Sequence, residues 1–165
     1  MNLKIKIAVI GLGYVGLPLA IEFGKKFKVF GFDIDTNRID NLKKNIDTNN
    51  ETSKKDFRQS KNINFTKNIE DLNNCNYYII TVPTPVNKNN KPDLKLIKRA
   101  CKDIGKILKI NQTVIFESTF YPGLTEEICV PILEKFSNLK FKKDFHCGYS
   151  PERINPGDKK NKLTN

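Results

Sequence analysis

The sequence predicts an α/β fold, a doubly wound and mostly parallel sheet with helices on both faces. Three observations support this. Strand-like segments rich in β-branched residues alternate with amphipathic, helix-like segments along the chain. A glycine-rich turn joins the first strand to the first helix. The chain has 165 residues, 38% of them hydrophobic, which is enough for one core and hardly for two domains.

The first half of the chain predicts three strands with helices between them. Residues 5–10 are apolar apart from Lys6, which is typical of a buried strand. Asp35 can cap a helix that carries Ile39, Leu42 and Ile46 on one face. The expected elements are strand 5–10, helix 14–26, strand 28–33, a helix after residue 35, a polar loop over 47–62 with a short helix from residue 53, and strand 63–66.

The second half predicts three further strands. Asp93 can cap a long helix, and Pro131 should kink a later one. Regular structure ends near residue 150, so we expect a domain over residues 1–150 and a different segment over 151–165. The expected elements are strand 77–82, loop 83–92, a helix from residue 93 that buries positions 94, 97, 101, 104 and 108, strand 113–118, helix 125–136 and strand 145–149.

Composition argues against several classes of partner. The net charge is +11, but it is spread along the chain and only four of the 29 basic residues are arginine, so we expect no nucleic-acid partner. The uncharged run over residues 7–21 is short and broken by glycines and a proline, so we expect no membrane span. The four cysteines form no CxxC pair, which favours reduced thiols in a cytoplasmic protein and no metal site.

The glycine-rich turn has the spacing of a dinucleotide-binding loop. Gly11, Gly13 and Gly16 form GxGxxG between a strand and a helix, and Asp33 ends the next strand. Gly11 would allow the tight turn, Gly13 the approach of a pyrophosphate, and Gly16 close packing of helix and strand. Asp33 would bind ribose hydroxyls and repel a 2′-phosphate. The pattern therefore predicts a Rossmann fold that binds NAD rather than NADP; the alternative is a glycine turn that binds no ligand.

Four stretches lie where the expected strands end, at the edge where such sheets bind ligands. They read Gly11-Leu-Gly-Tyr-Val-Gly-Leu-Pro18, Thr81-Val-Pro-Thr-Pro85, Glu117-Ser-Thr-Phe-Tyr-Pro-Gly123 and Tyr149-Ser-Pro-Glu-Arg-Ile-Asn-Pro-Gly-Asp158. Together they closely resemble the N-terminal, NAD-binding domain of the UDP-glucose/GDP-mannose dehydrogenase family, over essentially the whole chain.

The resemblance implies further contacts with the cofactor. Tyr14 and Val15 would lie against the dinucleotide, and Thr84 beside its pyrophosphate or ribose. Arg38 matches a family arginine near the adenosine end; the alternative is a solvated arginine on a helix surface.

The resemblance also places residues near the reacting end. Ser118 and Thr119 match a pair near the nicotinamide, where the threonine is linked to ordering a catalytic water. Glu152 matches a glutamate at the edge of the active site.

Members of this family oxidise the C6 hydroxyl of a nucleotide-linked sugar to the uronate with two NAD. Enzymes for UDP-glucose continue Ser-Pro-Glu with Phe-Leu-Arg-Glu-Gly, whereas this chain continues with Arg153-Ile-Asn-Pro-Gly157. That variant is similar to the branch acting on UDP-N-acetylglucosamine or UDP-N-acetylgalactosamine, and implies a role in surface polysaccharide biosynthesis. The full-length enzyme is expected to be a homodimer.

The resemblance also implies what this chain lacks. The family's nucleophilic cysteine, in a Gly-Gly-x-Cys-x-Pro setting, and its catalytic lysine follow the NAD-binding domain. No cysteine here has those neighbours, so we expect the chain alone to be inactive and residues 151–165 to begin the connection to a central helix and substrate domain. Two alternatives stay open: a self-standing NAD(H)-binding module or inactive remnant with a sensing or partner-binding role, and another Rossmann dehydrogenase acting on hydroxy acids, against which the Ser-Pro-Glu-Arg stretch argues.

Overall fold

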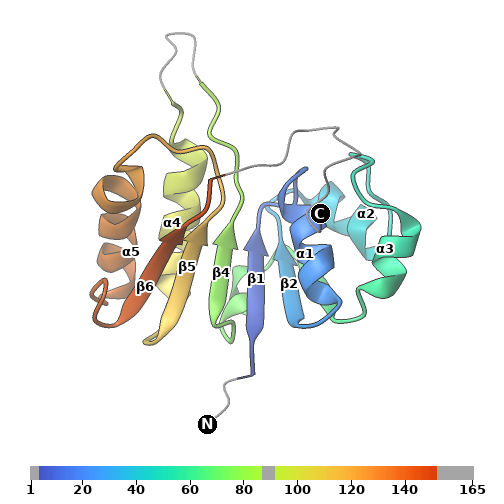
Figure 1. The fold of residues 1–165 in the computed structure, drawn as a ribbon, viewed down its shortest axis with the longest axis horizontal. Coiled ribbons are helices and arrows are strands. Elements are labelled where there is room, and N and C mark those ends of the chain that lie inside the picture. Colours follow the sequence, from blue (N-terminus) through green and yellow to red (C-terminus); the bar gives the residue numbers. More distant parts are fainter. Residues whose placement is uncertain (1–3, 87–91, 152–165) are drawn as a thin grey trace.

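A six-stranded, fully parallel sheet organises the molecule, with strand order β3-β2-β1-β4-β5-β6. The computed structural model describes residues 4–86 and 92–151. All strands end along one edge of the sheet, the upper edge in Figure 1. The order reverses between β1 and β4, the point where doubly wound sheets bind dinucleotides. The strands are β1 (Lys6–Ile10), β2 (Lys28–Phe32), β3 (Ile63–Thr66), β4 (Tyr77–Ile80), β5 (Gln112–Phe116) and β6 (Phe145–Tyr149).

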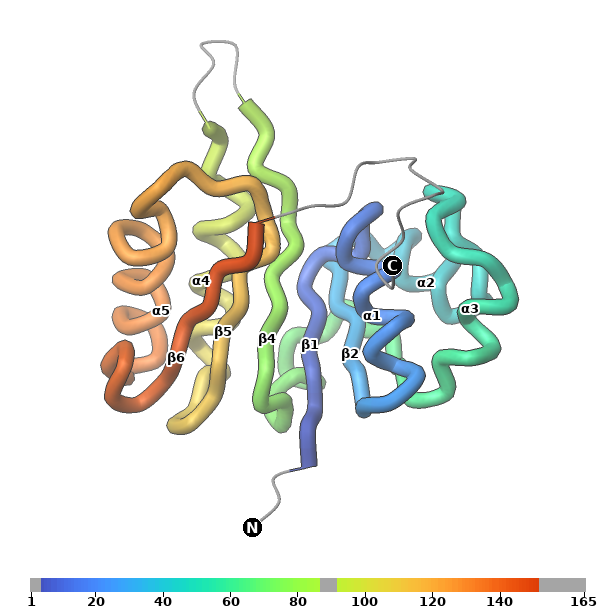
Figure 2. Tube along the Cα trace, in the orientation of Figure 1, coloured from blue at the N-terminus to red at the C-terminus, as the bar shows by residue number. Residues whose placement is uncertain are grey.

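Helices pack on both faces of the sheet and enclose two cores. Side chains of α1 (Gly16–Gly24), α2 (Thr36–Lys43) and α3 (Lys54–Gln59) share one core with the sheet. Side chains of α4 (Lys95–Ile107), the short helices η1 (Ile69–Leu72) and η2 (Thr125–Cys129), and α5 (Val130–Ser137) share the other. The chain trace in Figure 2 shows α1, α2 and α3 gathered at one end of the sheet and α4 and α5 at the other. The predicted fold class is therefore confirmed.

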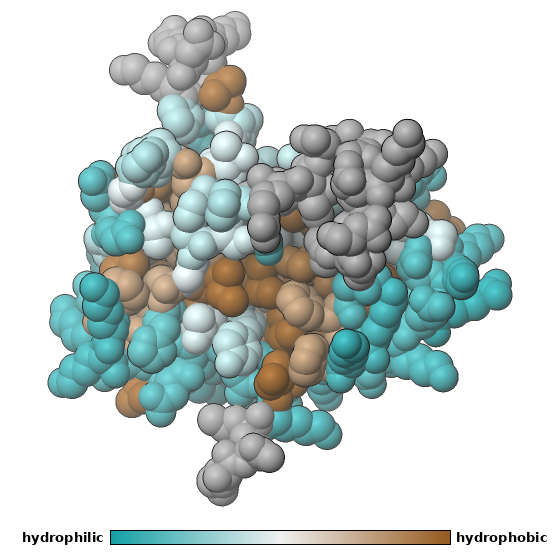
Figure 3. All heavy atoms as spheres, viewed as in Figure 1, coloured by the Kyte–Doolittle hydropathy of each residue, from teal (hydrophilic) through white to brown (hydrophobic). Residues whose placement is uncertain are grey.

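The face seen in Figure 1 is only partly covered by the described helices. Apolar side chains gather in its middle, and hydrophilic ones lie over both ends (Figure 3). Ile79 on β4 is 4% exposed, whereas Tyr77 on the same strand is 37% exposed. This face of the molecule is thus apolar at its centre and hydrophilic at both ends.

Most predicted boundaries agree with the structure within two residues. Strands β3 and β6 coincide with the prediction, and the carboxylate of Asp35 caps α2 by accepting the N–H groups of Asn37 and Arg38. The prediction that Ile46 lies on the inner face of this helix is wrong. The helix ends at Lys43, Asn45 adopts a left-handed φ of 58°, and Ile46 is 46% exposed. Asparagine tolerates that conformation, which turns the chain out of the helix.

Two predicted helices have structural details near their starts that the prediction did not contain. The N-cap of α4 is Leu94, and Asp93 accepts the N–H of Lys95 from one position earlier. The helix expected to kink at Pro131 begins as a π-helical turn, η2, and continues as α5 with the proline in its first turn. Proline lacks an N–H and crowds the preceding turn, which a widened turn accommodates. Within the described ranges no helix is both long and apolar enough to span a membrane, and no group of potential metal ligands gathers there.

Candidate functional site

The glycine-rich turn lies where β1 ends and α1 begins. Gly11 has φ +93°, and its N–H donates to the carbonyl of Phe32 at 2.9 Å. A Cβ atom at Gly16 would lie 1.9 Å from the Gly11 carbonyl oxygen and 2.3 Å from Oγ1 of Thr81. That hydroxyl also lies 2.6 Å from the Gly11 oxygen, so both obstacles are held in place. Gly11 therefore makes the turn, and Gly16 permits the close approach of helix and strand.

Gly13 is placed quite differently from the other two glycines. A Cβ atom there would meet nothing within 4 Å, and its φ lies outside the left-handed region. The helix that follows has no side-chain cap at Val15 and no acidic residue in its first turn. An uncapped helix N-terminus beside open backbone is suited to an anion, because the free N–H groups and the helix dipole both favour negative charge.

Asp33 follows β2 and holds the turn from the side. Its Oδ2 accepts the N–H of Leu12 at 2.8 Å, and its Oδ1 accepts the N–H of Asp35 at 3.0 Å. Each carboxylate oxygen has a second lone pair available for a ligand hydroxyl. The side chain is thus both fixed in orientation and able to accept further hydrogen bonds.

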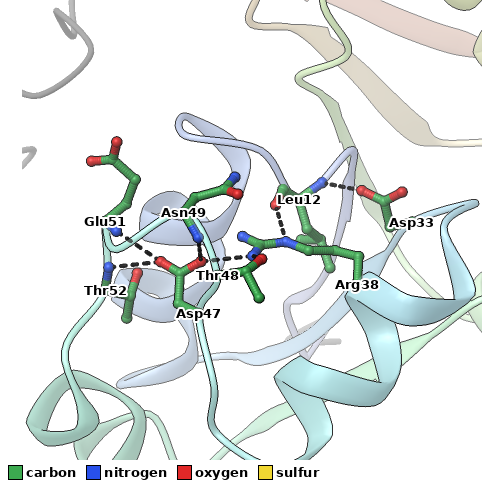
Figure 4. A network of polar contacts seen from close by, with 8 residues as sticks. All are labelled: Leu12, Asp33, Arg38, Asp47, Thr48, Asn49, Glu51 and Thr52. Carbon is green, nitrogen blue, oxygen red and sulfur yellow. Dashed lines mark hydrogen bonds and ion pairs between the residues drawn. The ribbon is translucent and has the colours of Figure 1, made fainter.

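Arg38 is not a solvated arginine, and that alternative is wrong. The residue is 8% exposed, its Nε donates to the carbonyl of Leu12 at 2.9 Å, and its Nη1 lies 2.7 Å from Oδ1 of Asp47 (Figure 4). A buried cation needs such partners, since burial without them is strongly unfavourable. The guanidinium therefore braces the glycine-rich turn from inside the protein.

Two adjoining pockets open at this edge of the sheet. Gly11, Asp33, Val82 and Pro83 line both of them. The first, here called the apolar pocket, lies against α4 and is also lined by Ile34, Ile69, Leu96 and Ile104. The second, here called the loop pocket, is also lined by Gly13, Tyr14, Val15, Thr84, Ser118 and Thr119.

Most residues predicted to contact the cofactor therefore lie on one continuous surface. The exceptions are Gly16, which packs against Gly11 and Thr81, and Arg38, which lines neither pocket. Glu152 lies outside the described residues.

The loops after β4 and β5 are tied together at the far end of the loop pocket. Oγ of Ser118 donates to the carbonyl of Val82 at 2.9 Å, and Oγ1 of Thr84 donates to that of Thr119 at 2.8 Å. Glu117, to which the sequence analysis gave no role, also lines this pocket and accepts the hydroxyl of Ser150 at 3.1 Å. Its position between strand β5 and the predicted Ser-Thr pair was the available signal.

The four cysteines do not contribute a reactive thiol to this surface. Cys75, Cys101 and Cys129 are fully buried, Cys147 is partly buried, and none lines either pocket. Burial raises the pKa of Cys75 to about 11 and that of Cys147 to about 12. Since the thiolate is the nucleophile, the thiols of Cys75 and Cys147 are unreactive near neutral pH.

Comparison with known proteins agrees with this geometry. The family model "UDP-glucose/GDP-mannose dehydrogenase family, NAD binding domain" matches residues 5–165. A UDP-N-acetyl-D-glucosamine 6-dehydrogenase of Salmonella typhi is 54% identical over 162 residues, and Protein CapL of Staphylococcus aureus is 55% identical over 153. These matches cover 98% and 93% of this chain but 38% and 36% of the relatives. The chain thus spans less than two fifths of their length.

Solved structures show the same fold. A UDP-D-ManNAc dehydrogenase from Pyrococcus horikoshii superposes with a TM-score of 0.83 at 34% identity, covering 93% of this chain and 37% of that protein. A ternary complex of GDP-mannose dehydrogenase from Pseudomonas aeruginosa superposes with a TM-score of 0.84 at 26% identity, covering 91% and 36%.

Proposed function

Because the chain belongs to the UDP-glucose/GDP-mannose dehydrogenase family, we propose that it is the NAD-binding domain of a nucleotide-sugar 6-dehydrogenase. The observation that carries the proposal is the glycine-rich turn. Gly16 packs closely against Gly11 and Thr81, whereas the space beside Gly13 is empty and lies next to an uncapped helix N-terminus. The turn lies between the apolar pocket and the loop pocket, whose lining includes the hydroxyl side chains of Thr84, Ser118 and Thr119. A dinucleotide likewise has two ends that differ in polarity.

The two pockets suggest how NAD would lie. The pyrophosphate would cross Gly13 at the N-terminus of α1, and the adenosine ribose would meet Asp33. The adenine ring would enter the apolar pocket, and the nicotinamide would reach Ser118 and Thr119 in the loop pocket. NAD supplies the hydride acceptor in this reaction. The described residues bind and orient it.

We assign the substrate to the UDP-N-acetylhexosamines. In support, two relatives at 54% identity are named UDP-N-acetyl-D-glucosamine 6-dehydrogenase, and the sequence after Ser-Pro-Glu departs from that of the UDP-glucose enzymes. Oxidation of the C6 hydroxyl to the uronate removes two hydrides, so two NAD are reduced per sugar. We place the thiol that captures the intermediate aldehyde in a part of the enzyme beyond this chain, since no cysteine here lines the pockets.

We place the enzyme in the cytoplasm, in surface polysaccharide biosynthesis, as a homodimer when full-length, with no nucleic-acid or membrane partner. Within the chain, residues 1–150 would form the cofactor domain and residues 151–165 would lead to the substrate domain. Thr119 and Glu152 would support the chemistry without acting as nucleophile.

The test is calorimetric titration of the chain with NAD and with NADP. NAD should bind more tightly, and Asp33→Ala should weaken NAD binding by about 1–3 kcal/mol, the scale for losing a charged hydrogen-bond partner. Asp40→Asn is the matched control, because it removes a carboxylate from the exposed side of α2. A chain that binds neither dinucleotide, or NADP as tightly as NAD, contradicts the proposal.

A second assay addresses the substrate. An enzyme of the relatives' full length that contains this chain should form about two NADH per UDP-N-acetylhexosamine and act more slowly on UDP-glucose, as followed by NADH absorbance. Faster turnover of UDP-glucose would overturn the substrate assignment and leave the cofactor assignment standing.

A further inference from the structure

Asp47 is a buried carboxylate at the centre of a hydrogen-bonded loop. It lies after α2, and its side chain is 1% exposed. Its donors among the described residues all lie within 3.0 Å of its two oxygens (Figure 4). They are Nη1 of Arg38 and the N–H of Asn49 on Oδ1, and the N–H groups of Glu51 and Thr52 on Oδ2.

Arg38 connects this loop to the glycine-rich turn. Its Nε donates to the Leu12 carbonyl at 2.9 Å, and Leu12 in turn donates its N–H to Asp33 at 2.8 Å. The guanidinium and the Asp33 carboxylate therefore hold opposite sides of a single residue of the turn. Nη1 also donates to Thr48, while Nη2 is buried and has no partner among the described residues.

The position of this arginine matters for the choice between NAD and NADP. The two cofactors differ by one phosphate on the adenosine ribose, and an arginine near that ribose commonly accommodates it. Arg38 lies five residues after Asp33 in the sequence. In space, Leu12 of the turn lies between the two side chains and is hydrogen-bonded to both. Left unpaired, its charge would offset that of Asp33 and attract the phosphate. Paired with Asp47, it leaves the charge of Asp33 without that offset.

We propose that Asp47 is a specificity-determining residue for the cofactor: by neutralising and burying Arg38, it prevents the arginine from accepting a 2′-phosphate. The proposal rests on the NAD site described above, and it goes beyond Asp33 as the sole source of NAD preference. Asp47 lines neither pocket, so it acts through Arg38 and Leu12.

The test compares NAD and NADP affinities in three variants of the chain. Asp47→Asn keeps the shape of the side chain and removes its charge. The ratio of NADP to NAD affinity should therefore rise about tenfold, the scale of a solvent-screened attraction between one arginine and one phosphate. Arg38→Met leaves the three backbone bonds to Asp47 in place and should lower the ratio. The double variant restores the net charge and should return the ratio close to that of the parent.

A purely structural role predicts a different pattern. If the ion pair only stabilises the loop, all three variants should lower the affinities for NAD and NADP by the same factor. The ratio of NADP to NAD affinity would then stay unchanged. The rise in Asp47→Asn should also shrink at high salt, since a phosphate–arginine attraction is screened. Asp40→Asn, which removes the same charge from the exposed surface of α2, should leave the ratio at the parent value.

The outcomes separate this inference from the proposed function. A parent chain that binds NAD, with an unchanged ratio in Asp47→Asn and Arg38→Met, overturns the role of Asp47 alone. A parent that binds neither dinucleotide overturns the proposed function and this role with it. Should Asp47→Asn fail to fold, Arg38→Met still decides the matter, because an unchanged ratio in that variant contradicts the proposal.

Discussion

Alanine at Gly13 and alanine at Gly16 should have opposite consequences, although only two residues separate them. Each substitution adds one methyl group to the same turn. At Gly13 the new Cβ meets nothing within 4 Å, whereas at Gly16 it would lie 1.9 Å from a backbone oxygen. The pair therefore distinguishes a glycine kept for a ligand from a glycine kept for packing.

The magnitude at Gly16 follows from what blocks the methyl group. The Gly11 oxygen is backbone, and the Thr81 hydroxyl lies between it and the Ile10 carbonyl, at 2.6 and 3.0 Å. Neither obstacle can move without breaking these contacts. Overpacking of this kind destabilises by about 1–3 kcal/mol, which for a domain of this size lowers Tm by about 2–12 °C.

Gly13→Ala should leave Tm unchanged or raise it by about 1–4 °C, because the chain loses unfolded-state freedom without a clash. The same methyl group would occupy the space proposed for the pyrophosphate, so NAD affinity should fall. Gly13→Val, with a larger side chain, should abolish binding while the domain still melts cooperatively.

The assay is thermal unfolding with and without NAD, in parallel with calorimetry. The parent should show an NAD-induced rise in Tm, and Gly13→Val should show none. Gly13→Ala and Gly13→Val variants that bind NAD as well as the parent would refute the proposal that the pyrophosphate crosses Gly13. A Gly16→Ala variant with an unchanged Tm would refute the packing argument.

The 165-residue chain alone should form no NADH with any UDP-sugar, because its thiols lie away from both pockets. Positioning of the substrate by a substrate domain can lower the reaction barrier by about 7–11 kcal/mol. A steady rise in NADH absorbance would require a nucleophile among the four cysteines. Burial raises the pKa of Cys75 from 9.0 to about 11, so its contribution to stability is complete below pH 9 and is lost as the pH rises to about 11. Between pH 9 and 11, the Tm of Cys75→Ala should fall less steeply with pH than the Tm of the parent. An equal dependence of Tm on pH in the two proteins would contradict the raised pKa of Cys75.

The fold could be read from the sequence because its signals are local and mutually consistent. A β-branched run, a glycine turn and an acid at the end of the next strand each require particular backbone geometry, and together they suit one topology. Gly11 and Gly16 could be assigned for the same reason: a tight turn and a close helix–strand contact leave no room for another residue.

The surroundings of Arg38 could not be read in this way. An arginine in a polar helix, followed by the polar run 47–52, is typical of a solvated surface. What buries it is a loop that folds back on Asp47, through backbone N–H groups that every residue type can supply. Hydrophobic periodicity does not indicate such contacts, because their donors are main-chain groups. The exposed position of Ile46 likewise results from the left-handed turn at Asn45, which periodicity does not predict.

The glycine-rich turn is consequently organised before a ligand arrives. Leu12 is fully buried, its N–H is held by Asp33 and its carbonyl by Arg38, and Asp47 holds the arginine. A turn fixed in this manner need not be ordered on binding, so more of the interaction energy with the dinucleotide remains as affinity. The same braces place one negative and one neutralised positive charge beside the expected ribose. Loop rigidity and cofactor choice are therefore two results of one arrangement, and substitutions at Asp47 should alter both, whereas substitutions at Gly13 should alter only the space available to the ligand.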